Sequence, residues 1–277
     1  MQRARGLTAS DLLITDEMRT RGHQRRSGVR GLRLEVTSES TVITTHFIAL
    51  CLHVSKSAYT LTRHPSPVTR SERRSALTSM PDSNTFTPDF YKRFYSNART
   101  RVTTKREMYR RAMAVAALVR HLEIGVTRIL DAGCGLGWMR EGLLEIFPRA
   151  QYVGIEVSKH LCDELGWVCA SLADYRARGQ FDLIICYDVL QYISDRDAVK
   201  AMNNLARLSR GAVYFHAPTL EDWQANADRS VSDSAIHLRE AQWYRTRLSR
   251  SFRQVGFGIH ARKGIDIHQW ELEKGTE

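Results

Sequence analysis

Glycine stands at every second position from Gly133 to Gly137, directly after a short apolar run. Glycine lets the backbone turn tightly and leaves no side chain between the loop and a bound ligand. Glu156 stands nineteen residues beyond Gly137, at the end of a second apolar run. A carboxylate in that position can accept hydrogen bonds from both ribose hydroxyls of a nucleoside. The spacing therefore predicts a nucleoside-containing ligand that lies on the loop and reaches Glu156.

Two residues beside this loop indicate which kind of nucleoside-containing ligand it binds. Asp131 puts a negative charge next to the loop, and Trp138 stands where the dinucleotide fingerprint G-x-G-x-x-G needs a small residue. The carboxylate would repel a pyrophosphate, but not the amino group and sulfonium of S-adenosylmethionine. The pattern therefore favours S-adenosylmethionine as the ligand. The alternative ligand is a nicotinamide dinucleotide, which would make the protein an NAD(P)-dependent oxidoreductase.

The elements that must position these residues alternate along the chain. Short apolar runs predict strands at residues 127–130, 151–156, 166–170, 181–187 and 212–216, and helical patterns lie at 105–122, 138–147, 159–165 and 195–208. Ser194 suits a helix N-cap. The tail predicts a helix at 241–255 and strands at 256–262 and 266–272. Nearly continuous apolar strands separated by helices indicate a doubly wound, mostly parallel α/β sheet.

The N-terminal third has a different composition. Residues 1–80 hold 13 Lys and Arg against 6 Asp and Glu, so +7 of the formal charge of +11 lies there. These residues show no helical or strand period, which predicts a poorly ordered basic extension over 1–84 that precedes a single α/β domain over 85–277. Met80 precedes a polar run, and we expect the natural start near it. A genuine basic arm or targeting segment is the rival interpretation.

Composition and charge exclude several classes. The net charge of +4 outside residues 1–80 argues against a nucleic-acid partner. No apolar run reaches the length of a membrane helix, and no secretory signal pattern opens the chain, so we expect a cytoplasmic protein without a membrane anchor. The five cysteines lack C-x-x-C spacing, which predicts reduced thiols and no metal site. The oligomeric state is not indicated.

Three segments carry a family resemblance. VTRILDAGCGLGWM (126–139) resembles the first motif of the class I S-adenosylmethionine-dependent methyltransferases. YVGIEVS (152–158) resembles their acidic second motif, and FDLIICYDVLQYISD (181–195) their fourth strand and following loop. The resemblance implies a Rossmann-like sheet of seven strands whose last strand is antiparallel. It also implies methyl transfer from S-adenosylmethionine, here to a small-molecule acceptor.

The resemblance further assigns cofactor contacts. The methionine end would meet the loop residues Asp131, Gly133, Cys134, Gly135 and Gly137. The ribose would meet Glu156, with Val157 beside it, and the adenine would meet Ser171 and Leu172. Tyr187 and Asp188 would form a wall of the site. The third motif commonly carries an acidic residue next to the adenine, and Ser171 stands there instead, with Asp174 slightly later, so the adenine assignment departs from the family pattern.

The catalytic residues are less marked. Methyl transfer is an in-line displacement in which the protein mainly positions the nucleophile, so a general base is optional. Tyr187 and His216, at two predicted strand ends, are the candidates to orient or deprotonate the acceptor, although each could instead be a packing residue. Cys134 and Cys186 are interpreted as core thiols. A methyltransferase-like binding protein without turnover is a further alternative.

A helical stripe of aromatic residues precedes the sheet. Phe90, Tyr91, Phe94 and Tyr95 have the spacing of one helix face. Packing against the domain is the plainer interpretation, and a lid over the substrate is the other. Strand four is followed by neither an Asn/Asp-Pro-Pro-Tyr signature nor a Pro-Cys pair. We therefore expect no exocyclic amine of adenine or glutamine and no cytosine carbon as acceptor.

Overall fold

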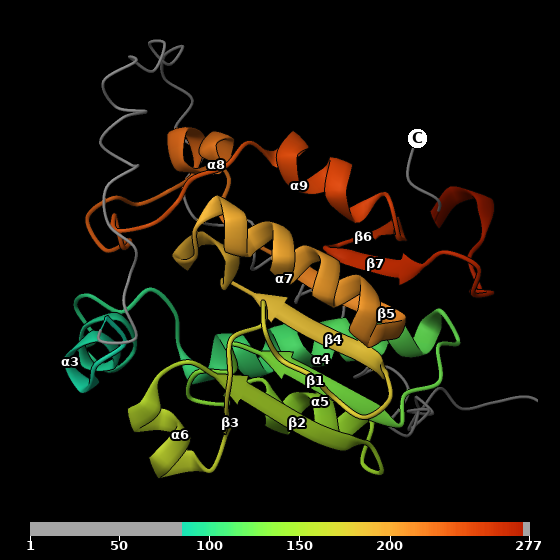
Figure 1. The fold of residues 1–277 in the computed structure, drawn as a ribbon, viewed down its shortest axis with the longest axis horizontal. Coiled ribbons are helices and arrows are strands. Elements are labelled where there is room, and N and C mark those ends of the chain that lie inside the picture. The colour runs from blue at the N-terminus through green and yellow to red at the C-terminus, as the bar shows by residue number, and fades with distance from the viewer. Residues whose placement is uncertain (1–84, 274–277) are drawn as a thin grey trace, which may run out of the picture. The chain divides into compact units, whose positions relative to one another are not determined.

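The computed structural model describes residues 85–273 (Figure 1). The strands are β1 (Arg128–Ala132), β2 (Gln151–Glu156), β3 (Val168–Cys169), β4 (Phe181–Tyr187), β5 (Ser209–His216), β6 (Phe252–Gly256) and β7 (Ile259–Arg262). The α-helices are α3 (Pro88–Tyr91), α4 (Lys105–His121), α5 (Arg140–Ile146), α6 (Lys159–Leu165), α7 (Asp195–Leu208), α8 (Leu220–Ala225) and α9 (Ala241–Leu248). A π-helix η2 (Lys92–Ser96) and the 3-10 turns η3 (Leu190–Tyr192) and η4 (Glu271–Glu273) complete the elements.

The seven strands form one sheet in the order β3-β2-β1-β4-β5-β7-β6. β1 pairs in parallel with both β2 and β4, and β4 pairs in parallel with β5. β7 is antiparallel to β5 and to β6. The predicted doubly wound, mostly parallel seven-stranded sheet with an antiparallel last strand is confirmed.

Helices cover both faces of the sheet. Ile129, Leu183 and Ile185 pack on one face with the buried side of α4 and α5. Leu130, Ile184 and Val213 alternate with them and pack on the other face with α7 and α9. Figure 1 shows α7 in front of the strands and α4 behind them. The central strands β1, β4 and β5 are largely apolar because both of their faces are buried.

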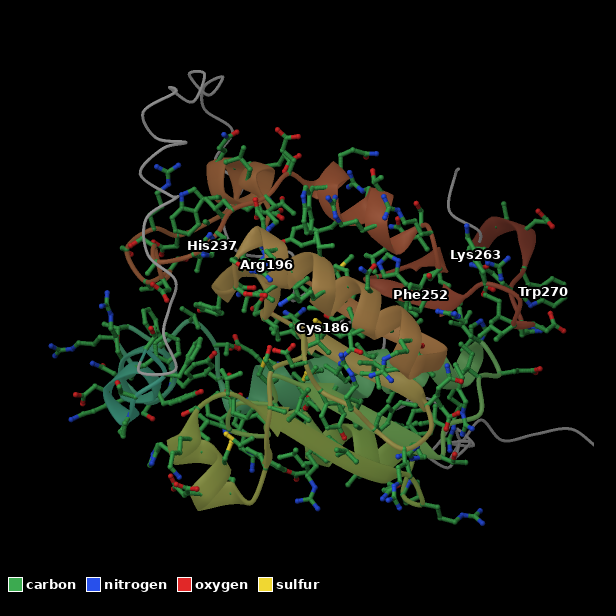
Figure 2. All side chains as sticks on the ribbon, in the orientation of Figure 1. Cys186, Arg196, His237, Phe252, Lys263 and Trp270 are labelled. Atoms are coloured by element: carbon green, nitrogen blue, oxygen red, sulfur yellow. The ribbon has the colours of Figure 1, made fainter. Side chains whose placement is uncertain are left out.

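Cys186 illustrates how deep this core is. Its thiol is fully buried, and Figure 2 places it where β4 passes behind α7. Burial raises the pKa of the thiol well above its ordinary value, so it stays protonated. The interpretation of Cys186 as a core thiol agrees with this environment.

Several predicted boundaries are confirmed to the residue. β2, β4, α6 and α7 occupy the predicted ranges. Ser194 caps α7, where its side chain accepts a hydrogen bond from the amide of Asp197 at 3.2 Å. α4 begins with a capping box in which Thr104 and Glu107 satisfy each other's backbone amides. Local signals therefore define these elements.

The C-terminal prediction is wrong in three places. The helix predicted over 241–255 ends at Leu248, and residues 252–256 form β6. The strand predicted over 256–262 starts only at Ile259, because residues 256–258 form a turn with positive φ angles. Residues 266–272 form no strand, since this segment runs alongside the end of α4, where the amide of His268 donates to the carbonyl of Leu122 at 3.1 Å.

Smaller corrections concern the ends of other elements. β1 runs two residues further than predicted, through Asp131 and Ala132, because both pair with β2 and β4. β3 spans only two residues, since Gly166 takes a left-handed conformation at the end of α6. α5 begins at Arg140 rather than Trp138, after the last turn of the glycine loop.

Residues 1–84 and 274–277 lie outside the described residues, and so does the predicted extension with its start near Met80. Among residues 85–273, no helix has the length and hydropathy needed to span a bilayer. The same range contains no group of three or more His, Cys, Asp and Glu side chains arranged to hold a metal ion.

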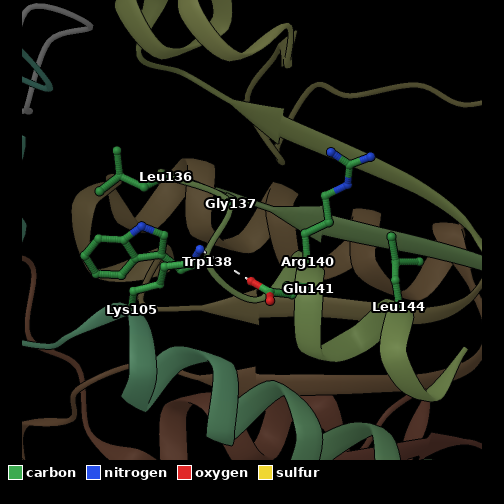
Figure 3. Close-up of a pocket in the computed structure, with 7 residues that line it drawn as sticks. All are labelled: Lys105, Leu136, Gly137, Trp138, Arg140, Glu141 and Leu144. Atoms are coloured by element: carbon green, nitrogen blue, oxygen red, sulfur yellow. Dashed lines mark ion pairs between the residues drawn. The ribbon is translucent and has the colours of Figure 1, made fainter. Parts of the chain in front are cut away.

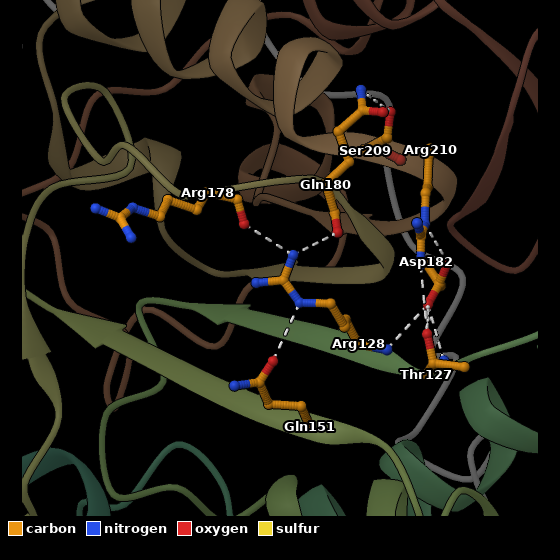
Figure 4. Close-up of polar contacts among 8 residues, drawn as sticks. All are labelled: Thr127, Arg128, Gln151, Arg178, Gln180, Asp182, Ser209 and Arg210. Carbon is orange, nitrogen blue, oxygen red and sulfur yellow. Dashed lines mark hydrogen bonds and ion pairs between the residues drawn. The ribbon is translucent and has the colours of Figure 1, made fainter.

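A buried carboxylate ties three strands together at the edge opposite their carboxyl ends (Figure 4). One oxygen of Asp182 accepts hydrogen bonds from the hydroxyl and amide of Thr127, both at 2.8 Å, and from the amide of Arg128 at 2.9 Å. The other accepts from Nε of Arg210 at 2.6 Å. Burial alone would raise the pKa of Asp182, but these bonds outweigh it and lower the pKa. The ionised carboxylate therefore joins the starts of β1, β4 and β5.

We predict that Asp182→Ala lowers the free energy of unfolding by about 2–4 kcal/mol, because buried amides lose their acceptor. The pKa of Asp182 is lower in the folded state, so its stabilisation is present above about pH 4, the unfolded value, and is lost as the pH falls below it. Urea unfolding at pH 7 and pH 3 measures both effects. Asp163→Ala, in an exposed ion pair on α6, serves as control and should change stability by less than about 1 kcal/mol.

Candidate functional site

The glycine loop between β1 and α5 requires left-handed backbone at all three glycines. The φ angles of Gly133, Gly135 and Gly137 are 70°, 50° and 70°. A Cβ on Gly133 would lie 2.6 Å from Val189, and one on Gly137 would lie 2.6 Å from Trp167. A Cβ on Gly135 would meet no atom within 4 Å. The outer glycines are thus needed for packing, whereas Gly135 borders open space on the loop.

The side chain of Trp167 fixes the glycine loop by a hydrogen bond and by packing. Its indole Nε1 donates a hydrogen bond to the carbonyl of Gly135 at 2.9 Å. Its ring fills the space left by the missing side chains of Gly137 and Gly154, where a Cβ would approach within 2.6 and 2.8 Å. Sequence reasoning missed this residue. The one available signal was a large indole next to the short third strand.

Glu156 closes the loop against the end of β2. Its carboxylate is almost fully buried at 5% exposure and accepts a hydrogen bond from the amide of Gly135 at 2.8 Å. It also accepts from the amides of Val157 and Ser158 at 2.8 and 3.0 Å. The structure brings Glu156 and the loop together, as the spacing predicts. A carboxylate has about four acceptor positions, so one stays available to a ligand hydroxyl.

Asp131 lies deeper than the sequence suggests. Its carboxyl group is buried at the end of β1 and accepts a hydrogen bond from the hydroxyl of Tyr152 at 2.5 Å. Burial raises the pKa of Asp131 to about 7, against the lowering effect of Tyr152, and Glu156 adds to the rise. Asp131 is therefore only partly ionised near neutral pH. The negative charge beside the loop is thus smaller than the sequence suggests.

The other predicted cofactor contacts lie along the same strand ends. Cys134 is buried in the loop, and burial raises the pKa of its thiol, so it is no nucleophile. Ser171 follows β3, and its hydroxyl accepts from the amide of Ala173 at 3.2 Å. Leu172 is buried, and Nδ2 of Asn204 on α7 donates to its carbonyl at 2.7 Å. Asn204, which was not predicted, thus fixes the segment after β3.

The ends of β4 and β5 bring the two predicted catalytic residues together. Tyr187 pairs with His216 in the sheet register, and their rings stack with centroids 4.9 Å apart. Nδ1 of His216 lies 2.7 Å from a carboxylate oxygen of Asp188. Asp188 has a φ of 57°, which turns the chain away from β4 directly after the strand. The sequence indicated these residues separately, but not the pairing of Asp188 with His216.

The aromatic stripe before the sheet packs over this edge. The hydroxyl of Ser158 donates to the carbonyl of Phe86 at 2.7 Å and fixes the segment beside Glu156. Tyr95 contacts Trp138 of the loop at 5.7 Å between centroids, and Phe90 contacts Tyr192 at 6.2 Å. Figure 1 shows α3 at the carboxyl ends of β1 and β2. The stripe packs against the domain and at the same time covers the site.

An open hollow of about 420 Å³ lies on the outer side of the loop (Figure 3). Its lining residues come from the loop and from the starts of α4 and α5, and they are Lys105, Leu136, Gly137, Trp138, Arg140, Glu141 and Leu144. Lys105 and Glu141 form an exposed ion pair across it at 3.4 Å. Of the predicted contacts only Gly137 lines this hollow.

Comparison with known proteins identifies the family of the central segment. Residues 130–211 match the family described as methyltransferase domain. The malonyl-[acyl-carrier protein] O-methyltransferase of Legionella pneumophila is 30% identical over 35% of this chain and 38% of its own length. The ubiquinone biosynthesis O-methyltransferase of Chromobacterium violaceum is 25% identical over 53% of this chain and 71% of its own length.

The solved structures show a more distant likeness. The plantazolicin methyltransferase BpumL, in complex with a pentazolic desmethylPZN analog and SAH, is 17% identical. The match covers 59% of this chain and 69% of that one, with a TM-score of 0.46. Among the curated relatives, the chain spans only about two fifths of the length of the Legionella protein.

The loop geometry predicts different costs for three equivalent substitutions. Gly135→Ala should lower the free energy of unfolding by about 1–2 kcal/mol, the cost of a left-handed alanine. Gly133→Ala and Gly137→Ala should lower it by about 2–4 kcal/mol, because each Cβ also meets a packed side chain. Urea unfolding of the three variants checks the order. Equal losses at all three positions would mean that the space beside Gly135 is not open.

Proposed function

We propose that this protein, whose described domain belongs to the class I S-adenosylmethionine-dependent methyltransferases, transfers a methyl group from S-adenosylmethionine to a small-molecule acceptor. The observation that carries the proposal is the pair formed by Gly135 and Glu156. Gly135 borders open space, and the buried carboxylate that bonds its amide stands at the end of the neighbouring strand. This pair suits a nucleoside that lies on the loop with its ribose toward Glu156.

The residues present fit S-adenosylmethionine. The loop from Asp131 to Gly137 would hold the methionine end, Glu156 and Val157 the ribose, and Ser171 and Leu172 the adenine. When bound, this cofactor supplies a methyl group activated by its sulfonium leaving group. A dinucleotide fits less well, because Trp138 occupies the third position of the fingerprint. The chain's own task is to orient the acceptor and to exclude water.

The acceptor would lie against the ends of β4 and β5. The two curated relatives above are O-methyltransferases by name, which favours an oxygen atom as the methylated group. Asp188 would hold the proton on Nδ1 of His216, so that Nε2 is free to take a proton from the acceptor. Tyr187 would position the histidine ring by stacking against it.

We also propose a cytoplasmic location, and residues 85–277 as the catalytic domain. Cys134, Cys162, Cys169 and Cys186 are all free thiols, as suits a reducing compartment. Residues 1–84 are proposed as an extension that the methyl-transfer site does not need.

Transfer of an isotopic label tests the function. The full chain is incubated with S-adenosylmethionine that carries a trideuterated methyl group and with a small-molecule extract of its native cells. We expect a protein-dependent product whose mass contains the labelled methyl group. If SAH binds but no fraction gains the label, the domain is a binding protein without turnover.

Glu156→Ala should weaken binding of SAH by about ten- to a hundredfold, since one ribose hydrogen bond to a charged acceptor contributes about 1.5–3 kcal/mol. Glu156→Gln, which keeps one acceptor oxygen, should weaken binding less. Calorimetric titration measures both, with the exposed Glu164→Ala on α6 as the matched control. Because Glu156 also bonds three backbone amides, unfolding curves of each variant are recorded in parallel. An affinity of Glu156→Ala within threefold of wild type would show that the ribose is held elsewhere.

The His216 pair makes a separate prediction. His216→Ala and Asp188→Asn should each lower turnover on the labelled acceptor at least tenfold and leave SAH affinity within twofold. Asparagine tolerates the left-handed φ of Asp188, so this change removes the charge without straining the backbone. His160→Ala, exposed on α6, is the control. Unchanged turnover in both variants would remove the pair from the mechanism.

A further inference from the structure

Arg111 reaches from α4 to the strand ends where we place the acceptor. Its Nη1 donates a hydrogen bond to the hydroxyl of Tyr214 at 3.1 Å. Its Cζ lies 4.7 Å from the centre of the Tyr187 ring. Tyr187 is the last residue of β4, directly before Asp188. The guanidinium is therefore a neighbour of the proposed acceptor position, on the face of the sheet that α4 covers.

The charge of Arg111 lacks an anionic partner. Within residues 85–273, no carboxylate oxygen lies within 4 Å of its nitrogens. Asp188, whose negative charge helps to raise the pKa of Arg111, is bonded to His216 instead. Nε of Arg111 is buried and has no hydrogen-bond partner among the described residues. Tyr214 and Tyr187 are neutral, because burial raises the pKa of both hydroxyls.

Other arginines of the domain show what a structural role looks like here. The buried side chain of Arg239 forms an ion pair with Asp195, in which Nε lies 2.8 Å from a carboxylate oxygen. It also donates hydrogen bonds to the carbonyls of Leu190 and Ile193 at 2.7 and 2.6 Å. Arg210 forms an ion pair with Asp182, in which Nε lies 2.6 Å from a carboxylate oxygen. Within the described range 85–273, Arg111 donates a hydrogen bond to Tyr214 from one of its five N–H groups, and the other four have no hydrogen-bond partner there. A partly buried cation with surplus donors is costly unless an acceptor reaches it.

The surroundings of Arg111 define the chemistry of that acceptor. The rings of Tyr187 and Tyr214 stack at 6.1 Å and 9°, and His216 continues the stack beyond Tyr187. A planar guanidinium presents paired donors that match the two oxygens of a carboxylate or a phosphate. The aromatic wall beside it suits a flat or apolar body attached to such a group.

We propose that Arg111 binds an anionic oxyacid group, a carboxylate or a phosphate, on the acceptor. Arg111 is thus a substrate-binding residue that restricts the enzyme to acidic small molecules. The inference rests on the proposed function, since it identifies the class of acceptor that the methyltransferase takes. The oxyacid group is an anchor, and the atom to be methylated lies toward His216 and the loop.

Three probes that share a phenyl ring test the anchor, and two of them, benzoate and benzamide, also have nearly the same size and shape. Benzoate, phenyl phosphate and the neutral benzamide are titrated against the full chain saturated with SAH, and binding is followed by saturation-transfer NMR. We expect at least one anion to bind tenfold or more tightly than benzamide. Whether benzoate or phenyl phosphate binds more tightly identifies the group. Arg111→Met should remove the preference for the anion and leave SAH affinity within twofold.

Arg110→Met, the neighbouring position on the same helix, is the matched control and should keep the preference. If Arg111→Met fails to bind SAH, Arg111→Gln, which retains a donor toward Tyr214, replaces it with the same expected loss. Equal affinities for all three probes, no binding of either anion, or an intact preference in the Arg111 variant would overturn the proposal. If SAH fails to bind wild type, the proposed function falls, and the probes are titrated against the protein alone to test the anion site.

Discussion

The glycine loop after β1 is the constraint on which the site depends, because its backbone must enter the left-handed region three times in five residues. Only glycine adopts this conformation at little cost. Glu156 and Trp167 hold the loop from two sides, through the amide and the carbonyl of Gly135 respectively. The same carboxylate that fixes the loop is the one proposed to meet the ribose. The loop is thus shaped before a ligand arrives, which lowers the entropic cost of binding.

The strand order then separates two halves of the edge. β1 and β2 carry the loop and Glu156, whereas β4 and β5 carry Tyr187 and His216. The first half offers backbone groups and a carboxylate to a nucleoside. The second half combines a histidine held by a carboxylate with an aromatic wall and with Arg111, which has no anionic partner among residues 85–273. Methyl transfer needs two ligands side by side, and this division provides a place for each.

The parallel strands of the sheet could be predicted from the sequence alone. β4 is buried along almost its whole length and β2 over its second half, so their apolar runs indicate where these strands lie. The loop and Glu156 could be predicted because both follow such runs at a fixed spacing. The C-terminal hairpin could not, since the turn at residues 256–258 depends on backbone angles that its composition does not reveal.

The contacts at the site that the sequence did not predict all join residues that are far apart in the chain. The indole of Trp167 bonds a carbonyl 32 residues away, and the Arg111 side chain bonds Tyr214 103 residues away. The pairing of Asp188 with His216 follows from the register of β4 and β5. Each of these contacts arises from the packing of distant elements. A single sequence shows the residue types but not which of them meet.

Calorimetric titration of the full chain with SAH and with NAD⁺ distinguishes the proposed cofactor from a dinucleotide. We expect saturable binding of SAH, no binding of NAD⁺ at the same concentrations, and loss of SAH binding in Gly135→Val, whose side chain would enter the open space on the loop. Saturable binding of NAD⁺ without any heat from SAH would contradict this expectation.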